Sequence, residues 1–209
     1  KVNISTPSPW GRNVRPRGQD LQAGSLVLPK HHKIEPQDIG MLAMTGTAKI
    51  KVLAKPGVGI FSTGDELIPP GQPYQPGKIY ESNSFMLAGL VEKYGGFPVM
   101  AGKAADNPAF IEKSLNELVA RNVNFILTSG GVSVGTHDYV REVILGSGNI
   151  EFWKVNIRPG KPLVFGDYKG IPYFGLPGNP VSSFVSFLVF VLPAIRKFLG
   201  LPPLVRDCV

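Results

Sequence analysis

The chain has 209 residues, a length typical of one large domain or of one domain with a smaller appendage. Hydrophobic residues make up 43% and charged residues 18%, which excludes a disordered protein. The single cysteine, Cys208, excludes an internal disulfide framework and a cysteine metal cage, and it favours a reducing, cytoplasmic compartment. No apolar run near the start resembles a signal peptide.

The net charge of +7 is concentrated in the first part of the chain. Residues 1–57 carry nine Lys and Arg against three Asp and Glu, whereas residues 58–209 carry thirteen against twelve. Nucleic-acid binding typically interleaves basic and aromatic residues, but only Trp10 lies in the basic stretch. We therefore expect no nucleic-acid partner, although a basic segment helps to attract an anionic ligand.

Residues 1–57 are expected to form a small, mostly β appendage, the tail of a preceding domain. Residues 24–29 have the pattern of a turn leading into a short strand, and 49–53 begin with the alternation of a half-buried strand. Between them, 36–43 have the pattern of a short helix with proline in its first turn.

From Val58 onward, short apolar runs alternate with helical patterns. Strands are expected at 58–62, 97–100, 125–127, 152–157, 163–165 and 173–174, and helices at 82–94, 107–121, 137–145 and 180–199. This alternation predicts an α/β domain with a mainly parallel sheet over residues 58–200, followed by a tail at 201–209. Ligands of such sheets bind beyond the carboxyl ends of the strands.

The last predicted helix contains a run without polar side chains, at 187–195. A membrane span needs about 20 apolar residues. We therefore expect a buried core helix and no membrane span.

The glycine-rich loop at 128–135 is the strongest candidate site. It follows an apolar strand and leads into a helix, so its backbone N–H groups are placed to bind phosphate, and Ser129 and Ser133 add hydroxyl donors. A tight strand–helix turn is the structural alternative. Asp138, near the start of the next helix, either caps that helix or holds Mg²⁺ beside a phosphate.

Further acids follow other strands. Asp65 and Glu66 come directly after the first strand, where they make either metal or ribose contacts or a solvated turn. Asp106 follows the second strand, and capping the next helix and lining the site are equally open roles for it.

Two proline-containing loops complete the candidate site. The loop RPGKP at 158–162 holds Arg158 and Lys161 stiffly enough to bind an anion. The loop GLPGNPVS at 175–182 leads into the last helix, whose N-terminus favours an anion and also fits a simple helix cap. No Ser-His-Asp or Cys-His set is apparent, so the constellation suits transfer at phosphorus, or oxyanion handling, with a metal ion.

These stretches together resemble the molybdopterin molybdenumtransferase family, the molybdenum insertases of the MoeA and gephyrin E-domain type. The resemblance covers residues 11–200. It rests on STGDEL at 62–67, YESN at 80–83, SGGVSVG at 129–135 with Asp138, RPGKP at 158–162 and GLPGNPVS at 175–182, preceded by NVRPRGQD at 13–20. The glycine-rich loop alone also fits the adenylyltransferases of the MogA type.

The resemblance implies a three-layer αβα domain that binds adenylylated molybdopterin. Molybdate is inserted into the dithiolene of that substrate and AMP is released with the help of Mg²⁺. By position, the catalytic acids would be Asp138, Glu66 and Asp106, and the metal ligands Asp138, Glu66 and Asp65. Arg158, Lys161 and Ser133 would bind phosphate or molybdate. The remaining substrate-binding residues would be Asn83, Ser129, Gly130, Gly131, Gly135, Gly178, Asn179 and Ser182.

The chain also departs from the family pattern. Family members are longer, with further domains before and after this region, so we expect this chain to bind substrate and to turn over poorly. The resemblance implies a homodimer and an adenylyltransferase as a partner. Asn107 stands where the family often has a second acid. The alternatives are an adenylyltransferase that uses ATP and a non-catalytic scaffold domain of the gephyrin type.

Overall fold

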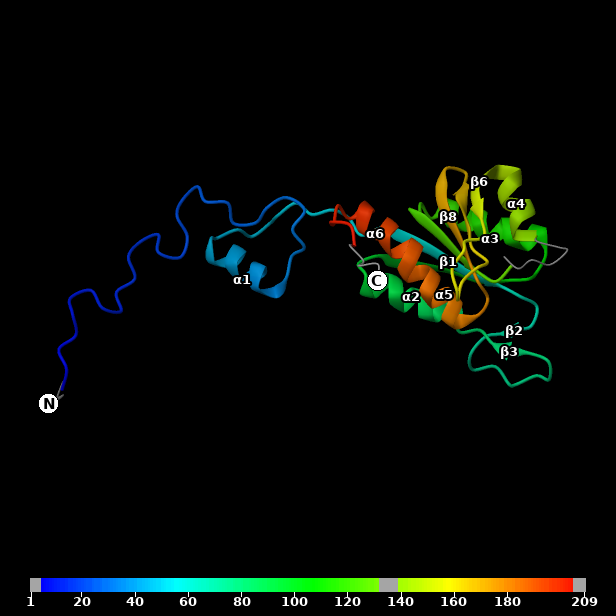
Figure 1. Cartoon of the computed structure of the whole chain (residues 1–209), viewed down its shortest axis with the longest axis horizontal. Coiled ribbons are helices and arrows are strands. Elements are labelled where there is room, and N and C mark those ends of the chain that lie inside the picture. Colours follow the sequence, from blue (N-terminus) through cyan, green and yellow to red (C-terminus); the bar gives the residue numbers. More distant parts are fainter. Residues whose placement is uncertain (1–4, 132–138, 205–209) are drawn as a thin grey trace. The chain divides into compact units, whose positions relative to one another are not determined.

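The computed structural model describes residues 5–131 and 139–204 (Figure 1). The chain divides into two compact units, Lys1–Lys51 and Val52–Val209. Within the described residues of the first unit, the one regular element is helix α1 (Pro36–Met44), as predicted. Asp38 fixes its first turn by accepting hydrogen bonds from the Glu35 backbone N–H and from His32 Nε2, each at 2.7 Å.

The prediction of a mostly β N-terminal appendage is wrong. No strand forms at 24–29 or 49–53 in the described part of the chain. A strand is stable only when a neighbouring strand pairs with its backbone, and alternation of side chains cannot supply that partner. Accordingly Ile50, Val52 and Leu53, which lie in the half-buried strand predicted at 49–53, are exposed.

The second unit is built on a six-stranded sheet with the order β4-β1-β5-β8-β7-β6. The strands are β1 (Gly57–Thr63), β4 (Phe97–Ala104), β5 (Phe125–Ser129), β6 (Gly148–Trp153), β7 (Val164–Tyr168) and β8 (Ile171–Leu176). The first four in spatial order are parallel, whereas β7 is antiparallel to both β8 and β6. A separate short pair, β2 (Leu67–Ile68) and β3 (Ile79–Tyr80), follows β1.

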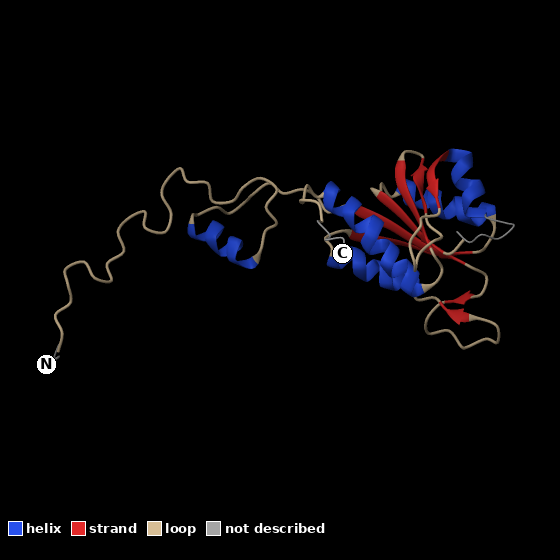
Figure 2. Cartoon of the chain, in the orientation of Figure 1, coloured by secondary structure: helices blue, strands red, loops and turns tan. Residues whose placement is uncertain are grey.

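Helices cover both faces of the sheet, which gives the expected three-layer αβα architecture (Figure 2). One face packs against α2 (Asn83–Lys93) and the C-terminal helix, and the other against α3 (Pro108–Ala120) and α4 (Tyr139–Ser147). Successive side chains of a strand point to opposite faces, so Ile60 joins the first core and Phe61 the second. The uninterrupted apolar run of β5 is therefore required, because both of its faces are buried.

The C-terminal helix is continuous from Pro180 to Phe198 but is not uniform. It consists of α5 (Pro180–Ser186), a π-helical turn (Phe187–Val191) and α6 (Leu192–Phe198). Proline lacks an N–H and clashes with the carbonyl four residues earlier, and the widened turn ends at Val191, two residues before Pro193. The helix is long and apolar enough to cross a membrane by length and composition, but its inner face belongs to the core of the sheet.

One predicted strand has different limits. The strand expected at 152–157 runs instead from Gly148 to Trp153. It ends where Lys154 takes a positive φ of 73°, a conformation that does not continue a strand. Residues 154–163 then form a loop that leads back into β7.

Candidate functional site

The register of the sheet brings five loops to one edge. In the parallel strands, Thr63 pairs with Ala104, Ser62 with Ser129, and Ser129 with Leu176, so β4, β1, β5 and β8 end together. Because β7 is antiparallel to β8, the loop 154–163 that precedes it lies at the same edge. In the sheet, β4 lies on one side of β1 and β5 lies on the other, so the strand order reverses at β1. Open α/β sheets bind ligands at such switch points.

The glycine loop after β5 makes a close backbone approach to β1. Gly130 and Gly131 have φ values of +85° and +66°. A Cβ on Gly130 would lie 2.4 Å from the carbonyl oxygen of Thr63, and one on Gly131 would lie 2.7 Å from Thr63 Oγ1. Only glycine fits this turn, because a side chain at either position would collide with β1.

Asn83 joins the β5 and β8 loops. Its Nδ2 donates to Ser129 Oγ and to the Gly178 carbonyl, both at 2.7 Å. Gly130 N also donates to the Leu176 carbonyl at 3.2 Å. Asn83 is 8% exposed and sits at the first position of α2, so the start of that helix fixes the spacing of two loops that are distant in sequence.

The acidic residues gather beside β1 and β4. The backbone N–H of Asp106 donates to Asp65 Oδ1 at 3.2 Å. Burial, followed by the charges of Asp65 and Glu66, raises the pKa of Asp106. The Glu66 carboxylate lies over Gly64, where a Cβ would meet it at 2.7 Å. Capping of α3 belongs to Asn107, whose Oδ1 accepts from Ala109 N at 2.9 Å, so Asp106 is not the cap.

The charge of this acidic cluster favours a divalent cation, but its described residues supply too few ligands to hold one. Its carboxylates repel one another, and a cation between them would relieve that repulsion. Within residues 5–131 and 139–204, however, no three His, Cys, Asp or Glu side chains are grouped closely enough to hold a metal ion. Phosphate oxygens or a further acid would have to complete the coordination.

The basic loop at 158–162 lies on the side of the glycine loop that faces away from the acidic residues. Arg158 and Lys161 are exposed, and in the described part of the chain neither is paired with a carboxylate. Gly160 anchors the loop on α5, because a Cβ there would meet Ser186 Oγ at 2.8 Å. Backbone bonds from Val155 N to the Lys161 carbonyl (3.0 Å) and from Lys154 N to that of Leu163 (2.8 Å) close its base.

The loop before α5 is a helix cap as well as part of the edge. Asn179 Oδ1 accepts from Ser182 N at 3.1 Å, and Pro180 occupies the first turn. Gly178 approaches the glycine loop, since a Cβ on it would lie 3.8 Å from the Cα of Gly130. Three of the predicted site residues, Ser133, Gly135 and Asp138, lie in 132–138, outside the described residues.

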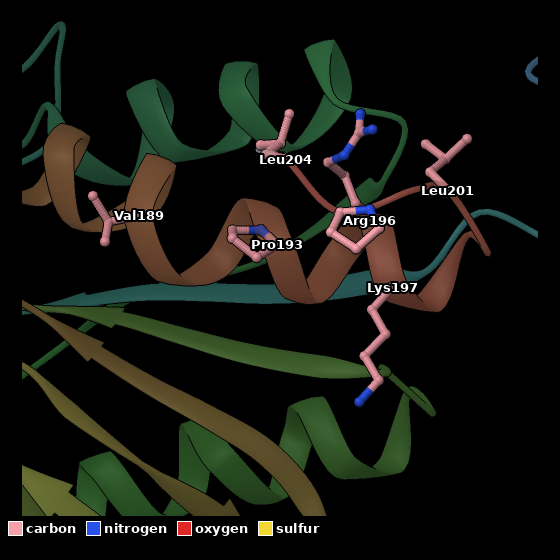
Figure 3. A pocket seen from close by; sticks show the side chains of 7 residues that line it. Val189, Pro193, Arg196, Lys197, Leu201 and Leu204 are labelled. Atoms are coloured by element: carbon pink, nitrogen blue, oxygen red, sulfur yellow. The ribbon is translucent and has the colours of Figure 1, made fainter. Parts of the chain in front are cut away.

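A pocket on the outer side of the C-terminal helix is remote from this edge (Figure 3). It is lined by Val189, Pro193, Arg196, Lys197, Leu201, Pro203 and Leu204. The helix starts at the carboxyl end of β8 and runs back, so that Phe198 packs on Phe125, the first residue of β5. The pocket is therefore at the amino edge of the sheet and contains none of the candidate site residues.

Residue patterns alone gave no role to several buried polar groups at the carboxyl edge. Glu81 is 6% exposed and accepts hydrogen bonds from Ser62 Oγ and Ser84, while Thr63 Oγ1 is buried without a partner. An acid placed directly before a Ser-Asn-Ser helix start was the available signal for Glu81. Nothing local indicates that its partner would be Ser62, 19 residues away.

Comparison with models of known families shows the family to which the chain belongs. The model described as "Probable molybdopterin binding domain" matches residues 59–197. The chain belongs to this molybdopterin-binding family. A second model, "MoeA N-terminal region (domain I and II)", matches residues 1–46.

Individual relatives agree with the family assignment. The chain is 41% identical over 202 residues to a molybdopterin molybdenumtransferase of Nostoc sp., covering 95% of this chain and 46% of that protein. It is 41% identical over 207 residues to molybdopterin molybdenumtransferase 2 of Mycobacterium tuberculosis, covering 96% and 51%. The crystal structure of the molybdopterin biosynthesis MoeA protein of Pyrococcus horikoshii superposes with a TM-score of 0.80 and 33% identity, covering 88% and 45%. The chain thus spans about half the length of the relatives it matches.

Proposed function

We propose that this chain acts in molybdenum cofactor biosynthesis, binding adenylylated molybdopterin and inserting molybdate into its dithiolene with release of AMP. The observation that carries the proposal is the order of charges along the carboxyl edge. Asp106, Asp65 and Glu66 follow β4 and β1, the glycine loop follows β5, and Arg158 and Lys161 lie beside β8 and β7.

This order suits a substrate that carries a diphosphate next to an oxyanion acceptor. The amides of the glycine loop would hold a phosphate, and the basic loop would hold molybdate, a doubly charged oxyanion. Release of AMP requires water to form a new P–O bond to the adenylate phosphorus as the bond from that phosphorus to the bridging oxygen breaks. The molybdopterin phosphate leaves with the bonding electrons, and the proton of the water passes to solvent. Asp65, Glu66 and Asp138 would hold Mg²⁺, which neutralises charge on phosphate oxygens when bound. Asp106 then serves as a further acid at the same edge.

The test is a single-turnover reaction of the full chain with adenylylated molybdopterin, Mg²⁺ and varied molybdate, with AMP release as the readout. We expect AMP release that depends on molybdate. Lys161→Gln removes one charge-assisted contact, so the half-saturating molybdate concentration should rise about tenfold. Lys113→Gln, on the exposed face of α3, is the matched control and should leave it unchanged.

Two outcomes would contradict the proposal. AMP release at a rate that does not depend on molybdate would contradict the proposed insertion reaction. Formation of adenylylated molybdopterin from ATP by the same chain would favour an adenylyltransferase.

We further propose a homodimer in the cytoplasm that receives its substrate from an adenylyltransferase. The large exposed side chains of Phe85, Val181 and Phe184 on the contacting helices α2 and α5 support a protein contact there. Sedimentation velocity of the full chain tests the dimer, and a single monomeric species at all concentrations would contradict it.

A further inference from the structure

A buried carboxylate at the carboxyl edge has no role in the proposed reaction. Glu81 lies between β3 and α2 and is 6% exposed. Its Oε1 accepts from Ser62 Oγ at 2.9 Å and from the backbone N–H of Ser84 at 2.8 Å, and its Oε2 accepts from Ser84 Oγ. Among the described residues, no Lys, Arg or His forms an ion pair with it. Burying an unpaired carboxylate is unfavourable, so these three hydrogen bonds are needed to offset the cost.

Glu81 also replaces the usual cap of α2. Ser82 occupies the N-cap position but makes no side-chain capping bond. The free N–H of Ser84, in the first turn, is instead satisfied by Glu81. A negative charge at this end of a helix is favourable. The Glu81–Ser62 bond therefore fastens the first turn of α2 to the end of β1.

Glu81, just before α2, and Asn83, the first residue of α2, bond to two strands that lie side by side. Ser62 and Ser129 are register partners at the ends of β1 and β5. Glu81 binds Ser62, and Asn83, two residues later, binds Ser129 and the Gly178 carbonyl. The position of Asn83, and with it the spacing of the β5 and β8 loops, thus depends on the carboxylate of Glu81.

We propose that Glu81 is a positioning residue for the phosphate-binding edge, a role that rests on the proposed function. It holds Asn83 through the first turn of α2, so that the loops at 129–131 and 177–179 keep the spacing that binds the adenylate phosphate. It acts through hydrogen-bond geometry and not through charge, because its carboxylate is buried and engaged by Ser62 and Ser84.

The test compares three variants of the full chain. Glu81→Ala removes all three bonds. Glu81→Gln keeps them without the charge, because its carbonyl accepts from Ser62 Oγ and Ser84 N while its amide donates to Ser84 Oγ. Glu92→Ala, at an exposed position of the same helix, is the matched control. Hydrogen exchange of the two loops and the affinity for AMP by calorimetry are the readouts.

We expect faster exchange at 129–131 and 177–179 in Glu81→Ala, with AMP affinity about tenfold weaker, as is common when a supporting hydrogen bond is lost. Glu81→Gln should restore both readouts to near the parent values. A merely structural cap would lower the melting temperature and leave loop exchange and AMP affinity unchanged, which would overturn the proposal. Equal losses in Glu81→Gln would overturn the claim that geometry and not charge is responsible.

Two further outcomes are informative. If Glu81→Ala does not fold, Ser62→Ala, which removes one bond only, should still speed exchange of the two loops, and unchanged exchange would overturn the proposal. If the parent chain does not bind AMP, the proposed function fails, but loop exchange still decides the role of Glu81.

Discussion

Replacing Gly130 and Gly170 by alanine, one at a time, separates the cost of a left-handed backbone from the cost of a steric clash with β1. Gly130 and Gly170 have φ values of +85° and +78°, so alanine at either position adopts a left-handed conformation that costs about 1–2 kcal/mol. The two sites differ in the space around the new methyl group. A Cβ at Gly130 would lie 2.4 Å from the Thr63 carbonyl oxygen, whereas nothing lies within 4 Å of one at Gly170.

The clash adds a second cost at Gly130 alone. The Thr63 oxygen is backbone at the end of a central strand, so it cannot rotate away as a side chain would, and overpacking of this kind costs about 1–3 kcal/mol. The free energy of unfolding should therefore fall by about 2–5 kcal/mol in Gly130→Ala and by about 1–2 kcal/mol in Gly170→Ala. Urea unfolding measures both values. AMP affinity should be lost in the first variant and kept in the second.

Equal destabilisation in the two variants would refute this reasoning. It would mean that the β5 loop has room to move away from β1. Unchanged AMP affinity in a folded Gly130→Ala protein would separately show that the close approach has no part in ligand binding.

Two other predictions concern buried or crowded polar groups. The raised pKa of Asp106 means that the folded state holds its proton more tightly than the unfolded chain, so this group reduces stability progressively as the pH rises above the ordinary aspartate pKa. Asp106→Asn should therefore unfold at a higher urea concentration than the parent at pH 7, with the difference vanishing in acid; no gain at pH 7 would contradict the acidic cluster. Ser183 Oγ is buried without a partner, so Ser183→Ala should stabilise the protein by about 1 kcal/mol. Ser84→Ala, which removes a bonded hydroxyl, should destabilise it by a similar amount, and the same sign in both would be inconsistent with this account.

The sequence predicted the α/β unit well because its signals are local. The apolar run at 125–127 predicted a strand buried on both faces, and it forms the first three residues of β5. The proline after Asn107 and the glycines after Tyr94 marked a helix start and a helix end. Local patterns failed where pairing decides the outcome. At 49–53 the alternation typical of a strand is present, but no strand in the described part of the chain pairs with it.

The candidate site was predictable in part for the same reason. Glycines, acids and prolines after apolar strands identify the loops, since the carboxyl ends of parallel strands share one edge. The order of those loops along the edge is not local information. It depends on the placement of β5 between β1 and β8, which no single loop encodes.

The basic loop shows most clearly how topology creates the site. Arg158 and Lys161 follow β6, which runs in the same direction as β8 because β7 is antiparallel to both, so β6 also ends at the carboxyl edge. Their place along that edge depends on β7, which pairs with β8 from Val164 opposite Gly175 and with β6 on its other side, so the loop 154–163 lies beyond β8. That strand order puts the two cations beyond the glycine loop, on the side away from Asp65 and Asp106. Opposite charges are thereby kept from neutralising each other across the edge, and each remains available to a ligand with a metal-binding phosphate at one end and an oxyanion at the other.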